Sequence, residues 1–230
     1  MNNNPEIKTR IGPIVGYYGY WVVLTYFSVV SAIVGMHFAL GGNIAYAIIC
    51  LLISGICDML DGPVARSKKR TEKEESYGIQ IDAFADIVSF GIFPAVIGYA
   101  VSPCFSSQDF TSPAMLLNMA VFCLYILTAL IRLAYFNVIE IELQGKKEKR
   151  VYFEGMPVTV VAILIPLVYV FILAFDLPLS VIFNVMLIIF SIAFIARVKI
   201  PKLRGRQLII FFIIGLPIVI YLAWRIGAKL

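Results

Sequence analysis

Residues 44–66 of the chain are IAYAIICLLISGICDMLDGPVAR, and residues 78–86 are GIQIDAFAD. The first stretch begins with an apolar run over residues 44–57 and then continues directly into two aspartates. A run of this kind is typical of a helix that enters a membrane, where an unpaired carboxylate costs a few kcal/mol. We therefore expect membrane helices whose acidic ends are compensated by something cationic.

The composition supports a membrane protein. Of 230 residues, 61% are hydrophobic and only 14% are charged, and the mean hydropathy is +0.92. Soluble domains are about half apolar and about a quarter charged. The charges are too few to cover a soluble globule, which argues against disulfide scaffolds, nucleic-acid readers, coiled coils and disordered tails. We predict an all-α integral membrane protein, a single domain over residues 1–230 and no nucleic-acid partner.

Seven apolar runs follow one another along the chain, separated by short turn segments or basic loops. They cover residues 17–38, 44–57, 79–101, 114–138, 156–175, 177–196 and 207–224. We therefore predict a polytopic bundle of about seven transmembrane helices. Residues 1–16 are expected to form an N-terminal segment in the cytoplasm or at the membrane interface.

Lysine and arginine residues gather in alternate loops. Sixteen of the nineteen lie before the first run or after the second, fourth and sixth runs. The positive-inside rule places these segments in the cytoplasm. We therefore expect a multi-pass protein of the cell inner membrane with a cytoplasmic N-terminus. Topology and contacts with anionic lipid account for most of these charges without a catalytic role.

Four aspartates occur at the predicted cytoplasmic ends of the second and third runs. Asp58 and Asp61 are three residues apart, and Asp82 and Asp86 are four apart, so each pair shares one face of a helix. Small residues lie on the same two faces and leave room for a substrate: Gly62 and Ala65 on the first helix, Gly78 and Ser89 on the second.

The two acidic helices are joined by one loop, so their carboxylates can converge. Four carboxylates without a cation would repel one another strongly. Ligands that are all oxygen favour Mg²⁺ or Mn²⁺, and two such cations about 4 Å apart suit an in-line phosphoryl displacement. A single intramembrane aspartate is as readily an ion-pathway or packing residue, but four at one depth favour a metal site.

The aspartates also form part of a recognisable pattern. Asp58-x-x-Asp61-Gly62-x-x-Ala65-Arg66, then eleven residues, then Gly78-x-x-x-Asp82-x-x-x-Asp86, resembles the signature of the CDP-alcohol phosphotransferases. That family usually has a shorter interval, and the additional residues here fall in a charged loop, where insertions are tolerated. The resemblance implies a helical membrane core of that type in which the four aspartates hold two divalent cations, Mg²⁺ or Mn²⁺.

The resemblance further implies individual roles. Asp86, besides binding metal, would accept the proton of the attacking hydroxyl group. Gly62 and Ala65 would let the cytidine nucleotide lie close to the helix, and Arg66 would lie beside the phosphates or the acceptor. The full set of expected nucleotide or substrate contacts is Asp58, Gly62, Ala65, Arg66, Gly78, Asp82, Ser89 and Arg132.

Shorter segments are similar to the phosphatidylserine synthases of this superfamily. They are DMLDG at 58–62, DIVSFG at 86–91 with Pro94-Ala95, RLAYFN at 132–137 and FEGMP at 153–157. This likeness implies a transferase of phospholipid biosynthesis that converts CDP-diacylglycerol and L-serine to phosphatidylserine and CMP, as a homodimer. The same chemistry with glycerol 3-phosphate or inositol phosphate is the nearest alternative.

A cation transporter is the alternative from another class of protein. The four aspartates lie at one predicted depth, and no acidic residue occurs midway through the first, fifth, sixth or seventh run. A pathway across the bilayer is therefore not visible. Arg132 is the one cation within a predicted span, and we expect it to pair with a substrate carboxylate or phosphate, or with one of the four aspartates.

Overall fold

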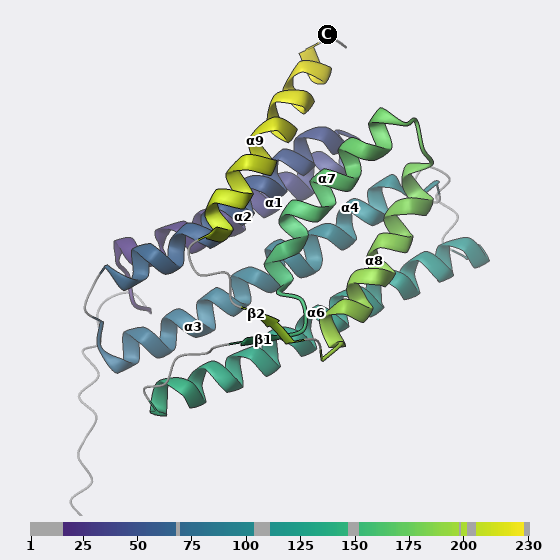
Figure 1. Ribbon diagram of the computed structural model, residues 1–230. Helices are drawn as coiled ribbons and strands as arrows, with labels where there is room; N and C mark the ends of the chain where they lie inside the picture. Colours follow the sequence, from purple (N-terminus) through teal and green to yellow (C-terminus); the bar gives the residue numbers. More distant parts are fainter. Residues whose placement is uncertain are drawn as a thin grey trace, which may run out of the picture.

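The computed structural model describes residues 16–67, 70–103, 111–146, 152–197, 199–201 and 206–227. Within these residues the chain forms a bundle of long helices (Figure 1). Four helical segments are long and apolar enough to span a membrane: Tyr20–Leu40, Ile44–Ala65, Glu72–Val101 and Pro113–Glu142. Three shorter apolar helices follow: Val158–Ala174, Leu179–Ile195 and Ile213–Gly227. The prediction of an all-α polytopic bundle of about seven helices is confirmed.

The first two spans form a helical hairpin. The 3₁₀ turn η1 (Tyr20–Val22) leads into α1 (Val23–Leu40), which packs along α2 (Ile44–Arg66). Gly42 in the connecting turn has a φ of +79°, a conformation that glycine adopts without strain. α2 continues past Pro63 and ends at Arg66. Asp58 and Asp61, which follow the apolar run, are therefore both helical, as their spacing predicts.

The third span is one continuous helical rod made of three pieces. α3 (Glu72–Asp86) passes into the π-helix η2 (Ile87–Ile92) and then into α4 (Phe93–Val101). A capping box begins the rod: the Thr71 hydroxyl accepts from the N–H of Glu74, and the N–H of Thr71 donates to the Glu74 carboxylate. The sequence did not predict the π-helix.

In the described residues of its second half, the chain forms four α-helices, a 3₁₀ turn and a short two-stranded sheet. After α6 (Pro113–Lys146), the strand β1 (Tyr152–Glu154) and the turn η3 (Val158–Val160) precede α7. The remaining elements are α7 (Val161–Ala174), α8 (Leu179–Ile195), β2 (Lys199–Pro201) and α9 (Arg206–Gly227). β1 pairs antiparallel with β2, so the segments that follow α6 and α8 lie at the same end of the bundle (Figure 1).

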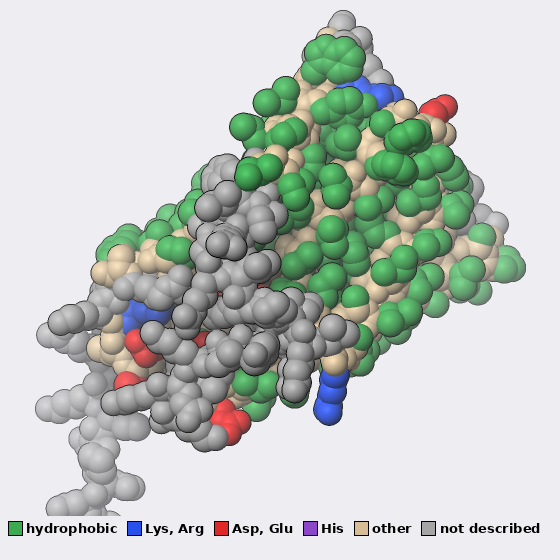
Figure 2. Space-filling model, viewed as in Figure 1, with side chains coloured by type: hydrophobic (Ala, Val, Ile, Leu, Met, Phe, Trp, Pro, Cys, Tyr) green, Lys and Arg blue, Asp and Glu red, His purple; other side chains and the backbone are tan. Residues whose placement is uncertain are grey.

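Large apolar side chains cover much of the outer surface. Phe27 on α1, Leu117 on α6 and Ile192 on α8 are each more than half exposed, and many similar residues surround them. Figure 2 shows one such face, where hydrophobic side chains cover α7 and α8 and the charged groups lie toward the ends. An apolar surface of this extent is unfavourable in water but favourable in contact with lipid. The protein is therefore a multi-pass integral membrane protein.

Two parts of the sequence predictions lie outside the described residues. The expected N-terminal segment, residues 1–16, does so except for Gly16. The backbone of Arg66 belongs to α2, but its side chain is not among those described.

Candidate functional site

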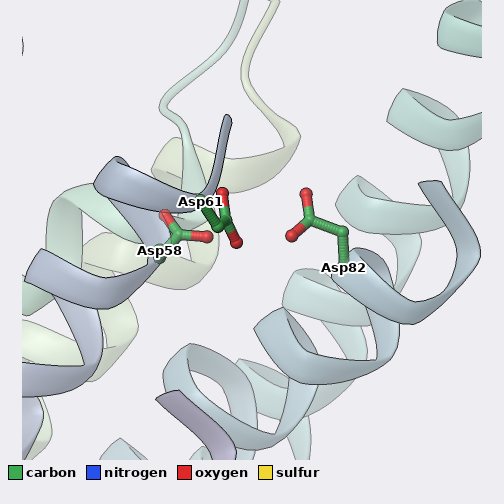
Figure 3. Close-up of side chains that lie close together, drawn as sticks. All are labelled: Asp58, Asp61 and Asp82. Carbon is green, nitrogen blue, oxygen red and sulfur yellow. The ribbon is translucent and has the colours of Figure 1, made fainter. Parts of the chain in front are cut away.

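Three of the four predicted aspartates meet in the structure. Asp58 and Asp61 extend from α2 and Asp82 from α3, and their carboxylates point toward one another (Figure 3). One oxygen from each of the three lies within 4.8 Å of the others. Asp61 is buried, and the other two are half-buried. Carboxylates this close together inside a membrane protein repel one another unless a cation binds them or some of them take up a proton.

Asp86 borders this cluster one turn further along α3. The carboxyl group of Asp86 lies within hydrogen-bonding reach of that of Asp58. The carboxyl groups of Asp61 and Asp82 are likewise within hydrogen-bonding reach of each other. The spacing of three and four residues places each pair on one face of its helix, and the packing of the helices brings the two pairs into one region.

The two acidic helices reach this region from different neighbours. α2 packs chiefly against α1, and α3 packs mainly against α1 and α6 rather than closely against α2. The loop that joins α2 and α3 therefore does not bring these two helices into close packing. α1 packs against both helices. It therefore sets the distance between α2 and α3, and their aspartate side chains extend across this distance toward one another.

α1 also contributes a polar group that the sequence reading missed. The Thr25 hydroxyl donates to Oδ2 of Asp61 at 3.1 Å, and Thr25 is itself buried. A carboxylate that accepts such a bond is held in one orientation, as are metal-ligating carboxylates generally. In the sequence, Thr25 is visible only as a threonine within an apolar run. That its partner is Asp61 depends on how α1 packs against α2.

The predicted small residues lie close to the aspartates. Gly62 and Ala65 are on the last turns of α2 and are half-buried. Gly78 is on α3, where an added Cβ would lie 3.0 Å from Nη1 of Arg70 and 3.3 Å from the ring of Trp21. The Arg70 guanidinium in turn lies 5.4 Å from the centroid of that ring. Gly78 therefore gives room to a cation and an aromatic ring beside the site.

The hydrogen-bond partner of Ser89 is a serine of α1 rather than one of the aspartates. Ser89 belongs to the π-helix η2, it is fully buried, and its hydroxyl is 3.2 Å from that of Ser28 on α1. Ser28 and Ser54 exchange further hydrogen bonds with each other's backbone carbonyls. The π-helix changes the rotation per residue, so a helical wheel extended from Asp82 does not hold beyond Asp86. A substrate contact for Ser89 stays a prediction.

Arg132 contacts a loop rather than open space. It lies on α6 with only 5% of its surface exposed. Its Nε donates to the carbonyl of Met156 at 2.9 Å and its Nη2 to that of Gly155 at 3.2 Å. Its guanidinium also stacks on Phe136, 4.6 Å from the ring centroid. The structure thus joins two of the segments singled out in the sequence, RLAYFN and FEGMP, through one side chain.

The loop held by Arg132 is also fixed to α8. The N–H of Met156 donates to the carbonyl of Ala193 at 3.3 Å. Gly155 has a φ of +74°, and an added Cβ would lie 2.7 Å from the carbonyl oxygen of Ala196. Arg132 is therefore a link between α6, this loop and the end of α8.

The donor set fits hard divalent cations. Asp58, Asp61 and Asp82 offer only oxygen atoms, the ligand type that Mg²⁺ and Mn²⁺ prefer. In the octahedral shell of Mg²⁺, neighbouring oxygens are about 3 Å apart and opposite oxygens about 4.2 Å apart, so carboxylate oxygens within 4.8 Å of one another would move together by no more than about 2 Å to share one ion. Three half-buried or buried carboxylates at this separation offer the oxygen ligands that such an ion binds, and Asp86 offers a fourth carboxylate.

The chain belongs to the CDP-alcohol phosphatidyltransferase family, whose model matches residues 22–198. This span includes all four aspartates, Arg132 and the loop at Gly155. The family resemblance drawn from the motif is confirmed.

The chain is similar to curated proteins named as serine O-phosphatidyltransferases and as an archaetidylserine synthase. The CDP-diacylglycerol–serine O-phosphatidyltransferase of Saccharomyces cerevisiae is 36% identical over 122 residues, 51% of this chain and 40% of the relative. The archaetidylserine synthase of Methanothermobacter thermautotrophicus is 30% identical over 167 residues, 73% of this chain and 63% of the relative. The CDP-diacylglycerol–serine O-phosphatidyltransferase of Helicobacter pylori is 32% identical over 124 residues, 53% and 46% of the two chains. The matches thus span roughly half the length of these relatives.

Proposed function

We propose that this protein is a phosphatidylserine synthase that transfers the phosphatidyl group of CDP-diacylglycerol to the hydroxyl of L-serine and releases CMP. The observation that carries the proposal is the meeting of Asp58, Asp61 and Asp82 within 4.8 Å at the positions of the family motif. The names of the relatives and the segments that resemble phosphatidylserine synthases support serine as the acceptor.

The roles of the residues follow from their placement. Asp58, Asp61, Asp82 and Asp86 are the proposed ligands of two Mg²⁺ or Mn²⁺ ions. Bound there, the cations would neutralise the pyrophosphate and stabilise the departing CMP. Thr25 would keep Asp61 in the orientation that binding needs.

Asp86 is the proposed general base. It would accept the proton of the serine hydroxyl as the serine oxygen forms a bond to the lipid-side phosphorus, while the bond from that phosphorus to the CMP oxygen breaks. The products are phosphatidylserine and CMP. Gly62 and Ala65, beside the carboxylates on α2, would admit the nucleotide close to the helix, with Arg66 near the phosphates and Gly78 and Ser89 near the substrate.

The membrane arrangement is part of the proposal. We place the site at the cytoplasmic face of the cell inner membrane, because the lysines and arginines gather in the segments at that end of the helices. A site at this depth is open to soluble serine and to a lipid diphosphate. We further propose that the domain covers the whole chain and that two copies form a homodimer.

CMP release from CDP-diacylglycerol by the purified protein in detergent tests the proposal. L-serine, glycerol 3-phosphate and inositol phosphate are offered separately, each with and without Mg²⁺ or Mn²⁺. We expect release only with serine and metal together, and a lipid product with the mass of phosphatidylserine. Release with another alcohol would keep the chemistry and reject serine, whereas no release with any alcohol would favour cation transport.

A matched pair of variants assigns the activity to the site. Asp82→Asn removes one carboxylate from the cluster, and we expect CMP release to fall by at least about a hundredfold. Asp176→Asn is the control, because it makes the same chemical change in the exposed turn between α7 and α8. Asp176 has a φ of +52°, which asparagine also tolerates. Equal losses in the two variants would contradict the assignment.

A further inference from the structure

The helix that carries Asp86 departs from α-helical geometry directly after this residue. In η2 (Ile87–Ile92) the N–H of Phe93 donates to the carbonyl of Val88, five residues earlier. Pro94 follows in the first turn of α4 and has no N–H. An α-helix needs that N–H to satisfy the carbonyl of Phe90, four residues earlier. The proline therefore deprives Phe90 of its regular helical donor.

A tyrosine from another helix provides the missing donor. The Tyr125 hydroxyl, on α6, donates to the carbonyl of Phe90 at 2.6 Å. Both side chains are fully buried. The Tyr125 ring also lies 5.6 Å from that of Phe194 on α8, which restricts its movement. In the interior of a membrane protein there is little water to replace such a bond, so an unsatisfied carbonyl would destabilise this segment.

The π-helix is held from a second direction as well. The Ser89 hydroxyl lies 3.2 Å from that of Ser28 on α1. η2 is thus linked to α6 by Tyr125 and to α1 by Ser89. Asp86 is the residue immediately before η2, so the rotation of the helix at Asp86 depends on how η2 is held. A change of one residue in helical register corresponds to about 100° around the helix axis, which would turn Asp86 away from Asp58.

We propose that Tyr125 is a positioning residue for Asp86, which acts by supplying the hydrogen bond that Pro94 cannot. The proposal rests on the proposed function, in which Asp86 binds metal and accepts the proton of the acceptor. Tyr125 touches neither substrate nor metal in this scheme. It maintains the π-helix, and the π-helix sets the direction in which Asp86 points.

Tyr125→Phe tests the proposal, since it removes one hydroxyl and keeps the ring. In the CMP-release assay we expect kcat to fall by about tenfold to a hundredfold while KM for CDP-diacylglycerol changes less than threefold. We also expect Mn²⁺ to raise the melting temperature of the variant less than that of the wild type, a readout that needs no activity. Tyr169→Phe is the matched control, because Tyr169 is a buried tyrosine of α7.

A second substitution separates positioning from simple stability. Pro94→Ala restores the N–H that the Phe90 carbonyl lacks. In the double variant Tyr125→Phe, Pro94→Ala we expect the melting temperature to recover and kcat to stay low, because a restored backbone bond favours a regular α-helix over the π-helix. The conclusion would be overturned by a kcat for Tyr125→Phe within twofold of wild type, or by activity that recovers together with stability.

Failure of the proposed function is distinguishable from failure of this inference. If the wild type releases no CMP with any acceptor alcohol, the proposed function has failed. The effect of Mn²⁺ on the melting temperatures of the wild type, Tyr125→Phe and Tyr169→Phe then decides the inference alone. Equal Mn²⁺ effects in all three proteins would reject it, and a smaller effect in Tyr125→Phe only would support it.

Discussion

Replacing Gly155 with alanine tests whether the loop after β1 is locked between α6 and α8. Gly155 has a φ of +74°, and its carbonyl accepts a hydrogen bond from Arg132. An added Cβ would lie 2.7 Å from the carbonyl oxygen of Ala196 and 3.3 Å from that of Phe194. Both contacts are with backbone atoms at the end of a helix, which cannot rotate away as a side chain can.

Two costs add up in this variant. An alanine with a positive φ is less stable than glycine by about 1–2 kcal/mol. The contact at 2.7 Å is an overpacking of the kind that costs about 1–3 kcal/mol. We therefore expect Gly155→Ala to lower the free energy of unfolding by about 2–5 kcal/mol, which corresponds to a fall in melting temperature of about 4–20 °C for a chain of this size.

Gly42→Ala isolates the steric cost. Gly42 has a nearly equal φ of +79°, but nothing lies within 4 Å of its added Cβ. It should lose only the conformational contribution, about 1–2 kcal/mol. Gly227→Ala, with open space and no positive φ, should change little. The measurement is the fraction of protein that remains monodisperse on size exclusion after heating in one detergent. If Gly155→Ala melts no lower than Gly42→Ala, the loop is not packed against α8 and the reasoning fails.

Two further predictions concern the site. Thr25→Val removes the hydroxyl that donates to Asp61 and keeps the shape of the side chain, so we expect the Mn²⁺ concentration for half-maximal CMP release to rise by about tenfold or more; an unchanged concentration would contradict a positioning role. Arg132→Lys keeps the charge but cannot donate to Gly155 and Met156 as the planar guanidinium does, so we expect a loss of about 1–3 kcal/mol in stability, measured by the same thermal assay. If Arg132 also binds the serine carboxylate, KM for serine rises in this variant, and an unchanged KM removes that role.

Part of the acidic site can be predicted from the spacing of its residues in the sequence. Asp58 and Asp61 share a helix face because they are three residues apart, and this holds in any fold that makes residues 44–66 helical. The same argument places Asp82 beside Asp86. Spacing does not predict the direction of Ser89, because the π-helix that begins at Ile87 changes the rotation per residue after Asp86. Pro94 within an apolar run was the signal that the sequence offered for this irregularity.

The hydrogen-bond partners of Arg132 cannot be predicted from the spacing of residues in the sequence. A buried cation in a membrane span must have partners, and the sequence offered substrate anions or aspartates as the candidates. In the structure its Nε and Nη2 donate to the carbonyls of Met156 and Gly155, more than twenty residues along the chain. Their availability depends on a turn with a positive φ and on the packing of that turn against α8. Neither can be read from residues 130–135.

The sequence by itself determined that the chain crosses a membrane several times as helices and that four aspartates lie on two helix faces, because hydropathy and helical periodicity are properties of neighbouring residues. Only the tertiary structure decided that Thr25 orients Asp61, that Tyr125 satisfies the carbonyl which Pro94 leaves without a donor, and that Arg132 fixes a loop. These partners come from different helices. Which polar groups meet depends on how the helices are rotated and packed against one another, and that balance is set by contacts distributed over the whole bundle.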